Sequence, residues 1–434
     1  MKRFITKIFV LTSVVSSFAQ TLRIYHIDVD QADATLFVSP SGQTLLVDSG
    51  RNGHGDRIRA VMQEAGVAQI DHFVATHYHE DHYGGVDDLL DVPAVTIVNA
   101  YDRGDKAAID STRLNSDTYR DYDAAVGHRA EQLTRGEMIP LDPLMRVTCI
   151  SSGGVVLSEQ DPVQHGEDEN DMSVSLLIQF GDFRYFTGGD IETATEQKIA
   201  DRNLVTDVDV YQANHHGADN GSSLPFIEDM QPRVIVISNG TNRRFRHPRE
   251  TVLARMSGLN SNPAIFQTNK YLNAANDNGG NVPDQFIGDL ESSDADGTIL
   301  LTVNQTTRSY TVAYRTESRT FAIKNRSSII IESLLPDPVD GSDRLFEEVT
   351  LRNNGAAVIG MQGWFLQDES GRVWILNEMG AIAPGESATI RRNGMPMSLN
   401  NRGDVIRLIG ADAREMDSFQ YNSSQPGVRI QTGH

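Results

Sequence analysis

The feature that most constrains this chain is the run Thr76-His77-Tyr78-His79-Glu80-Asp81-His82. The apolar residues 70–75 before it predict a buried strand, and Gly84-Gly85 after it predicts a turn into a helix. Imidazole and carboxylate groups together suit divalent ions such as Zn²⁺, Mn²⁺ or Fe²⁺. An isolated histidine usually only caps a loop or forms a hydrogen bond. Four ligand-type residues, His77, His79, Asp81 and His82, instead indicate a metal site on a strand-to-helix loop.

The first residues have the pattern of a secretory signal peptide. Lys2, Arg3 and Lys7 flank the start of an apolar stretch over residues 8–15, and small residues occupy positions 17 and 19. This predicts a signal peptide over residues 1–19, cut after Ala19. The apolar stretch is shorter than the ~20 residues that a spanning helix needs, and no later segment is long and apolar enough. We therefore expect a secreted or periplasmic protein with no transmembrane segment in the mature chain.

The net charge limits which partners the surface can bind, and the cysteine content limits which bonds can stabilise the fold. The formal net charge of -21 argues against binding of nucleic acid by the whole surface, because that attraction needs Lys and Arg to neutralise phosphates. A local basic cleft stays compatible with it. The single cysteine, Cys149, cannot form an internal disulfide, so we expect it in the core and expect stability to come from packing and bound metal.

The 434 residues predict two domains of different class. Residues 20–315 alternate strand-like runs with helix-like stretches, which indicates an α/β domain. Within it, the polar residues 102–137 have helical spacing and could cover one face of a cleft, without an assigned role. Residues 316–326 are predicted to be a linker. Residues 327–434 contain short strand-like runs between turns and no evident helix, which predicts an all-β accessory domain.

The C-terminal domain resembles the lamin tail domain, an immunoglobulin-like sandwich. The resemblance rests on Glu348-Val349-Thr350-Leu351-Arg352-Asn353, on the strand Gly363 to Leu366, on Ile382 to Glu386 and on Gly403 to Leu408. It covers roughly the last quarter of the chain. It implies that both tryptophans, Trp364 and Trp374, lie in the core, and that the domain could contact an envelope or a polymer.

The N-terminal domain resembles the metallo-β-lactamase fold, and in particular the extracytoplasmic hydrolase domain of ComEC-type proteins. The His-rich run, the segment 25–34 and the segment Thr44 to Gly50 carry this resemblance. It implies an α/β architecture of two sheets between helices, an αββα sandwich. Asp30 and Ala32 stand where that group normally has glycines. Asp48 would be the buried aspartate that holds the His-rich loop, although it could also be an ordinary turn residue.

Later segments follow the order of the same family. Asp190, after Gly188-Gly189, is the carboxylate expected to bridge two metals, although Gly-Gly-Asp alone is a common turn. One of His215 and His216 should complete the second metal site, and the other could donate a proton to the leaving group; the sequence leaves both open. The usual third imidazole of the first site is absent where this chain has Asn170 to Ser173. His128 and His165 could replace it, but each is a lone histidine in polar surroundings.

The segment Val236 to Pro248 also matches the ComEC-type pattern and carries the densest basic patch. Arginine's planar fork suits bidentate contact with phosphate. A solvated loop is the plain alternative for each arginine. The predicted substrate-binding residues are Asn242, Arg243, Arg244, Arg246 and His247.

The resemblance implies a secreted hydrolase with two divalent ions, Zn²⁺ or else Mn²⁺ or Fe²⁺. The expected metal ligands are His77, His79, Asp81, His82, Asp190, His215 and His216. The expected catalytic residues are Asp81, His215 and His247, acting with a hydroxide shared by the ions. We expect a phosphodiesterase or nuclease acting on DNA or another extracellular phosphodiester. The alternatives are a lactam, lactone or thioester hydrolase on the same fold, and a non-catalytic protein that binds an envelope or polymer through its β-sandwich.

Overall fold

The computed structural model describes residues 21–91, 95–104, 111–157, 159, 168–272, 278–291, 297–324, 329–339, 341–355, 358–411, 413 and 415–433. The predicted signal peptide and His165 lie outside these residues. Among the described helices, none is long and apolar enough to cross a membrane.

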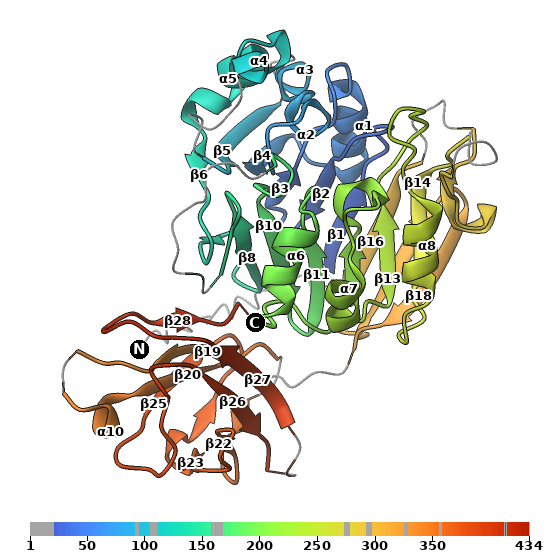
Figure 1. Ribbon diagram of the computed structural model, residues 1–434. Helices are drawn as coiled ribbons and strands as arrows, with labels where there is room; N and C mark the ends of the chain where they lie inside the picture. The colour runs from blue at the N-terminus through green and yellow to red at the C-terminus, as the bar shows by residue number, and fades with distance from the viewer. Residues whose placement is uncertain are drawn as a thin grey trace, which may run out of the picture.

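The N-terminal domain is built from two large sheets (Figure 1). The order of the first sheet is β18(Glu317–Ala322), β17(Ser309–Tyr314), β16(Ile299–Asn304), β1(Thr21–His26), β2(Thr35–Val38), β3(Thr44–Val47), β4(Gln69–Val74), β5(Thr96–Asp102) and β6(Glu131–Gln132). The order of the second is β15(Ile287–Asp289), β14(Ala264–Asn269), β13(Val234–Ile237), β12(Val210–Gln212), β11(Phe183–Thr187), β10(Ser175–Phe180), β8(Met145–Ser152) and β7(Met138–Ile139), with β9(Val155–Val156) paired to β8.

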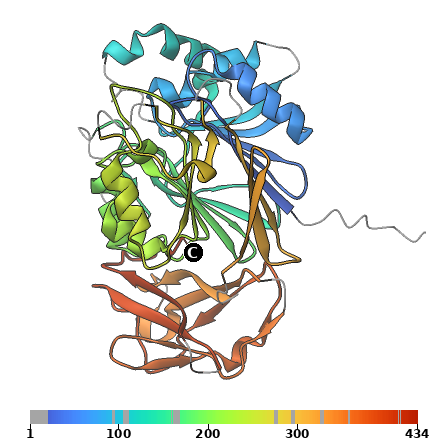
Figure 2. The ribbon, with the colours of Figure 1, turned by 90° about the vertical axis from the view of Figure 1, so that its right-hand side faces the viewer.

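Strand periodicity gives each sheet two buried faces. Leu22 and Ile24 of β1 point into a core that also holds Val234 and Val236 of β13, so this core lies between the two sheets. The alternate residues of β13, Ile235 and Ile237, pack instead against the helices α6(Thr193–Ala200), α7(Leu224–Met230) and α8(Glu250–Ser257). Figure 2 shows these green to yellow-green helices on the outer side of their sheet.

A third core covers the other face of the first sheet. It packs Leu46 and Phe73 against α1(Gly55–Ala65), α3(Val86–Leu90) and α5(Asp117–Ala125). The short helices α2(Glu80–Tyr83) and α4(Ser111–Leu114) and the 3₁₀ turn Gly127–Arg129 lie in the same region. Three cores separate four layers, and the predicted αββα sandwich is confirmed. Cys149 is fully buried between the sheets, as expected.

The predicted linker was placed too early. Residues 317–322 form β18, which pairs with β17 along its whole length and extends the first sheet. The alternation was hard to recognise because β18 is an exposed edge strand, so it has no buried face to impose an apolar pattern. The first sheet therefore continues to Ala322.

The C-terminal domain packs two small sheets face to face. One has the order β25(Ser387–Arg391), β20(Glu348–Asn353), β19(Ile329–Leu335) and β28(Ile430–Gln431), and the other has the order β23(Val373–Ile375), β22(Phe365–Gln367), β26(Asp404–Ile409) and β27(Glu415–Tyr421). A small pair joins β21(Ile359–Gly360) to β24(Ala381–Ile382). Trp374 is fully buried, whereas Trp364 is only partly buried. The expectation of no helix was wrong, because α10(Asp343–Phe346) and the 3₁₀ turn Asn377–Met379 are present.

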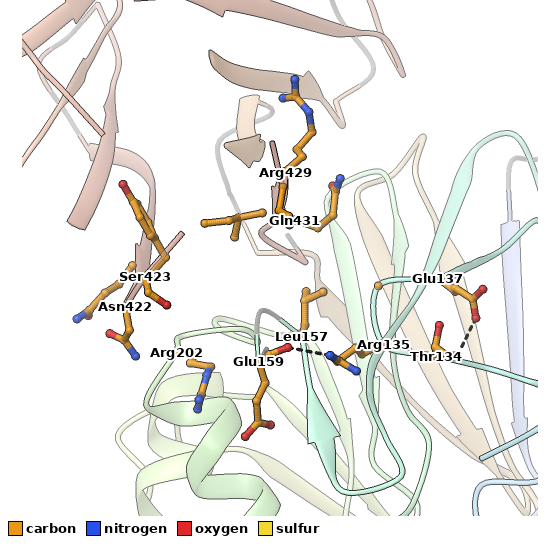
Figure 3. A pocket seen from close by; sticks show the side chains of 15 residues that line it. Thr134, Arg135, Glu137, Leu157, Glu159, Arg202, Asn422, Ser423, Arg429 and Gln431 are labelled. Atoms are coloured by element: carbon orange, nitrogen blue, oxygen red, sulfur yellow. Dashed lines mark hydrogen bonds between the residues drawn. The ribbon is translucent and has the colours of Figure 1, made fainter. Parts of the chain in front are cut away.

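The C-terminal domain is packed against one end of the N-terminal domain. Its terminal strand and residue Gly433 reach Leu157 and Ile150, and the apolar core of the second sheet continues into the sandwich. Arg146 on β8 lies 3.5 Å from the Glu332 carboxylate on β19. A cavity of about 660 Å³ remains beside this contact, lined among others by Arg135, Arg202 and Arg429 (Figure 3).

Candidate metal centre

The predicted site residues follow strands that end at one edge of the sandwich. The His-rich loop follows β4, Asp190 follows β11, the His215-His216 pair follows β12, and the arginine-containing loop follows β13. β11, β12 and β13 run parallel to one another, as do β3, β4 and β5. Their carboxyl ends therefore meet at the same edge. A pocket of about 1000 Å³ opens there, at the end of the domain away from the C-terminal sandwich.

One group of ligand atoms consists of His77, His79 and Asp190, which all lie within 4.8 Å of one another. His77 Nε2 is 2.8 Å from His79 Nδ1 and 3.8 Å from Asp190 Oδ2. Burial lowers the pKa of His77 well below its usual value and also lowers the pKa of His79. Both rings are thus kept neutral, which is the form that binds a metal.

A second group consists of Asp33, His82, Asp190 and His216. The Nδ1 atom of His82 is 2.8 Å from Asp48 Oδ2, and the Nδ1 atom of His216 is 3.0 Å from the carbonyl oxygen of Ser238. These contacts turn both Nε2 atoms toward Asp190. Second partners of this kind fix the tautomer and orientation of metal-binding histidines.

Unsatisfied atoms in the second group fit a cation. Among the described residues, His82 Nε2, His216 Nε2 and Asp190 Oδ1 are buried and form no hydrogen bond of good geometry, although His82 Nε2 lies 3.3 Å from Asp190 Oδ2. His216 Nε2 is 3.8 Å from Asp190 Oδ1 and 3.8 Å from Asp81 Oδ2, too far for a hydrogen bond. Buried polar atoms normally have partners, so convergent ones without partners suit a bound ion. Nitrogen and carboxylate donors in this mixture suit a borderline divalent metal.

Asp190 lies between the two groups. Gly189 has φ +55°, and a side chain at Gly188 would place its Cβ 2.4 Å from Asn214 Oδ1, so the close approach requires both glycines. Burial alone would raise the pKa of Asp190, but His82, His215 and His216 hold it well below the usual value. The same carboxylate and Asp48 raise the pKa of His82 well above its usual value against the effect of burial. Metal binding at His82 would therefore have to displace a proton from this ring.

Asp48 has the supporting position that the resemblance implied. Its two oxygens accept hydrogen bonds from the Thr76 amide at 2.8 Å and the Thr76 hydroxyl at 2.9 Å, in addition to the His82 contact. Asp48 has φ 60° and is buried, so it is not an ordinary exposed turn residue. Asp30, at a position where glycine was expected, likewise has φ 55°.

The two adjacent histidines take different positions. Both have left-handed backbone, with φ 50° at His215 and φ 53° at His216. His216 joins the second ligand group, whereas His215 has its Nε2 3.7 Å from Asp190 Oδ2 and its Nδ1 3.5 Å from Glu192 Oε1. His215 lines the pocket and is partly exposed. This arrangement favours His216 as the metal ligand and leaves His215 facing the pocket.

No described histidine takes the place of the missing imidazole near residues 170–173. Asn170 lines the pocket and donates to Glu192 at 2.8 Å, while Asp171 accepts from the Glu192 amide. His128 is exposed, bonds to the carbonyl oxygen of Asp123 and does not line the pocket.

The basic loop is only partly directed at the pocket. Asn242, Arg244 and His247 line it, together with Phe245 and Arg249, whereas Arg243 and Arg246 are exposed and do not. Those two were predicted from their place in the matching segment and from residue type, and their contact with substrate stays a prediction. Asn242 Oδ1 also accepts the Arg244 amide at 3.0 Å, so it shapes the turn.

His247 is poorly suited to the proton-donor role. Burial, with repulsion from His216 and His215, lowers the pKa of His247 to about 3, so the ring is neutral near pH 7. Its ring lies 5.3 Å from that of His215. His247 can therefore contact substrate or pack against His215, but it has no proton to donate as an imidazolium.

Several pocket residues were not singled out from the sequence. Arg51 lies 2.9 Å from Oδ2 of the predicted ligand Asp81, and Asp33, from the segment after β1, belongs to the second ligand group. Arg113, Ser116 and Glu192 also line the pocket or touch its histidines. Nothing in their local sequence marks them, because each reaches the site only through the tertiary fold. The polar stretch 102–137, which had no assigned role, supplies two of them.

Comparison with known proteins agrees with this geometry. Residues 27–111 match the metallo-beta-lactamase superfamily, and residues 323–423 match the Lamin Tail Domain. The chain is 26% identical to ComE operon protein 3 of Bacillus subtilis over 193 residues, which cover 43% of this chain. It is 25% identical to Recombination protein 2 of Haemophilus influenzae over 242 residues, or 54% of this chain. The matches span only 22% and 26% of the length of these two relatives.

Solved structures of the same fold are more distant. The crystal structure of the short form of human tRNase Z aligns at 12% identity with a TM-score of 0.31, and covers 49% of this chain and 91% of that one. At that TM-score the fold assignment rests on the sheet order and the sequence matches. The chain therefore joins a domain of the metallo-beta-lactamase superfamily, similar to the ComEC-type competence proteins, to a C-terminal lamin tail domain.

Proposed function

We propose that this chain is a secreted two-metal phosphodiesterase that acts on DNA or another extracellular phosphodiester. The observation that carries the proposal is the set of buried atoms without partners, His82 Nε2, His216 Nε2 and Asp190 Oδ1, facing one another beside the His77-His79 pair. Buried polar atoms without partners do not stabilise a folded protein, so their presence together supports a bound ligand that satisfies them.

Two groups of ligands that share Asp190 support two ions. His77 and His79 would hold one, His82 and His216 the other, and Asp81 or Asp33 would complete the second. Zn²⁺ fits the imidazole-rich donor set, and Mn²⁺ or Fe²⁺ fits the carboxylates. Divalent ions so placed supply a nucleophile from water near neutral pH and stabilise negative charge on the reacting group.

The charge of the pocket favours an anionic substrate once metal is bound. Its lining contains four arginines, Arg51, Arg113, Arg244 and Arg249, and six carboxylates, Glu80, Asp81, Asp168, Asp190, Glu192 and Asp219. Two divalent ions would turn this formal excess of negative charge into an excess of positive charge. The positive charge would be confined to one pocket of a chain whose net charge is -21, which supports attraction of a phosphodiester to this pocket alone.

The surrounding side chains suit phosphodiester cleavage. Arg244 and Arg249 line the pocket and can orient the phosphate and neutralise its developing charge. We assign proton donation to the leaving alcohol to His215, whose ring lies between Asp190 and Glu192. The lactam, lactone or thioester alternative uses the same metals but gives no role to the arginines.

The test is metal analysis of the mature chain followed by assays with added Zn²⁺ or Mn²⁺. We expect about two bound ions per chain and hydrolysis of bis(p-nitrophenyl) phosphate and DNA. His79→Ala and Asp81→Ala should each reduce turnover by at least ~100-fold through loss of metal. His128→Ala is the matched control, because it removes an imidazole that is exposed and distant from the pocket lining.

Several outcomes would contradict the proposal or its test. Hydrolysis of a β-lactam or thioester without phosphodiester turnover would favour the alternative enzyme. A chain that binds no metal, or unchanged phosphodiester turnover in both ligand variants, would favour a non-catalytic protein that binds through the sandwich. An equal loss in His128→Ala would show that the ligand variants act through general damage to the fold.

A further inference from the structure

Helices α4 and α5, from the polar stretch 102–137, contribute to one side of the metal pocket. They lie at the upper left of Figure 1, on the opposite side of the domain from α8. Arg113 of α4 and Ser116, the residue before α5, line the pocket. On the far side, Arg249 precedes α8 and also lines the pocket.

Arg113 and Arg249 line the same pocket as members of both ligand groups. His79 of the first group and His216 of the second also line it. Arg249 closely follows His247, whose ring is 6.5 Å from that of His216. Both arginines therefore add positive charge to the pocket that holds the candidate ligands.

A buried network holds Arg113 in this position. Arg113 Nη1 donates to Glu169 Oε2 at 3.3 Å, and Arg103 donates to both oxygens of the same carboxylate at 2.8 Å. Glu169 also accepts the amide of Tyr78, inside the His-rich loop, at 2.8 Å. Arg103 is itself fully buried and lies 4.4 Å from the Tyr78 ring centroid. One carboxylate therefore ties α4 directly to the metal-binding loop.

The far side offers an aromatic surface as well as charge. Phe245 is 37% exposed, and its ring is nearly parallel to that of His247, at 12° and 6.0 Å. The Arg244 guanidinium lies 5.3 Å from the Phe245 ring centroid. Such surfaces stack on nucleobases irrespective of sequence.

We propose that Arg113, positioned by Glu169, binds a second phosphate next to the one that is cleaved, so that the pocket selects polymeric phosphodiesters over single ones. The inference rests on the proposed phosphodiester function and deepens it. The pocket volume of about 1000 Å³ is at the upper end for sites that hold one small ligand. A strand that crosses the metals contacts Arg113 at one end and Arg249 at the other, with a base on Phe245.

The test compares binding of labelled thymidine dinucleotide and a longer oligothymidylate by fluorescence anisotropy, using the metal-loaded full chain. Arg113→Gln should weaken binding of the oligomer by about tenfold and the dinucleotide much less. It should also reduce the slope of log Kd against log salt by about 0.7, the value for one lost phosphate contact on a single strand. Arg120→Gln is the control, because Arg120 is an exposed arginine on α5 that pairs with Asp117.

Further variants separate the effects of charge, positioning and base stacking. Arg113→Lys retains the charge and should lie between wild type and Arg113→Gln, which separates charge from folding. Glu169→Gln changes the residue that positions Arg113 and keeps the arginine charge. It should weaken oligomer binding but leave the salt slope unchanged, whereas Arg113→Gln reduces that slope. An abasic oligomer of the same length should retain the Arg113 effect and lose only the contribution of Phe245.

The outcomes separate this inference from the proposed function. A wild-type chain that binds the oligomer no more tightly than the dinucleotide overturns the inference, as does an Arg113→Gln variant with an unchanged salt slope. If length-dependent binding depends on Arg113 but no phosphodiester is hydrolysed, the second phosphate site stands and the catalytic proposal fails.

Discussion

At the scale of single residues, the ligands depend on partners that never touch a metal. Asp48 holds His82 through Nδ1 and Thr76 through its amide and hydroxyl. Asp48→Asn keeps the shape of the side chain but removes the negative charge of the carboxylate. It also places an amide N–H donor where the Thr76 hydroxyl and His82 Nδ1 already donate. We expect metal affinity to fall by ~10- to 100-fold, as for other partners of metal-binding histidines.

The measurement is metal affinity by competition with a chelator, alongside thermal unfolding. Asp209→Asn is the matched control, since Asp209 is also a buried aspartate of this domain and accepts the amides of Arg184 and Lys324 away from the pocket. Its loss should lower Tm but leave metal affinity unchanged. Equal metal loss in both variants would mean that Asp48 acts only through global stability.

Residue types predicted the metal better than they predicted the complete site. The histidines and Asp190 could be recognised because their donor atoms are needed whatever the fold around them. Asp33 could not, since only the pairing of the two sheets brings it to His216. Arg243 and Arg246 do not line the pocket, although their chemistry suits phosphate, because the direction of a side chain in a tight turn is set by backbone angles that composition does not reveal.

At the scale of elements, the strained turn at His215-His216 is held by α6. Glu196 of α6 is fully buried and accepts the Asn214 side chain at 2.7 Å and the Ser223 amide at 2.7 Å. Two successive left-handed residues other than glycine persist only when their surroundings fix them. Glu196→Gln would place an amide N–H donor opposite the N–H groups of Asn214 and Ser223, which now donate to the carboxylate.

We expect Glu196→Gln to cost about 1–3 kcal/mol of unfolding free energy, from the unsatisfied donors, and to weaken the second metal site more than the first. Urea unfolding and stepwise metal titration would measure these effects. Glu228→Gln, on the exposed face of α7, serves as the control. Loss of both ions in equal measure would show that Glu196 does not act through the His216 turn.

Strand and helix ends differed from the sequence expectation where burial was weak. The buried strands β3 and β13 have continuous apolar runs because cores lie on both of their faces. The exposed strand β18 and the short helix α10 were missed, since neither buries a continuous apolar face. The periodicity of apolar residues in a sequence indicates which residues are buried. It indicates a helix or strand only where that helix or strand buries one face.

At the scale of the whole molecule, the lamin tail domain contacts the hydrolase domain at the end opposite the pocket. The contact is partly ionic: Glu332 lies 3.5 Å from Arg146 of the hydrolase domain and 3.6 Å from Arg352 of its own sandwich. It is also apolar, because the tail around Gly433 packs on Leu157 and Ile150. The two domains therefore share a core, whereas none of the residues lining the metal pocket comes from the lamin tail domain.

This arrangement predicts that stability and catalysis can be separated. Glu332→Ala leaves Arg146 partly buried without its partner, so we expect a loss of about 1–3 kcal/mol in unfolding free energy. Metal content and hydrolysis of bis(p-nitrophenyl) phosphate at 25 °C should stay unchanged, because the contact lies far from the ligands. Glu386→Ala, an exposed glutamate on the same sandwich, should change neither property. If Glu332→Ala instead lowers metal content or turnover while the protein is still folded, the sandwich influences the metal site through the shared core. The lamin tail domain would then act as part of the enzyme and not as an attached binding domain.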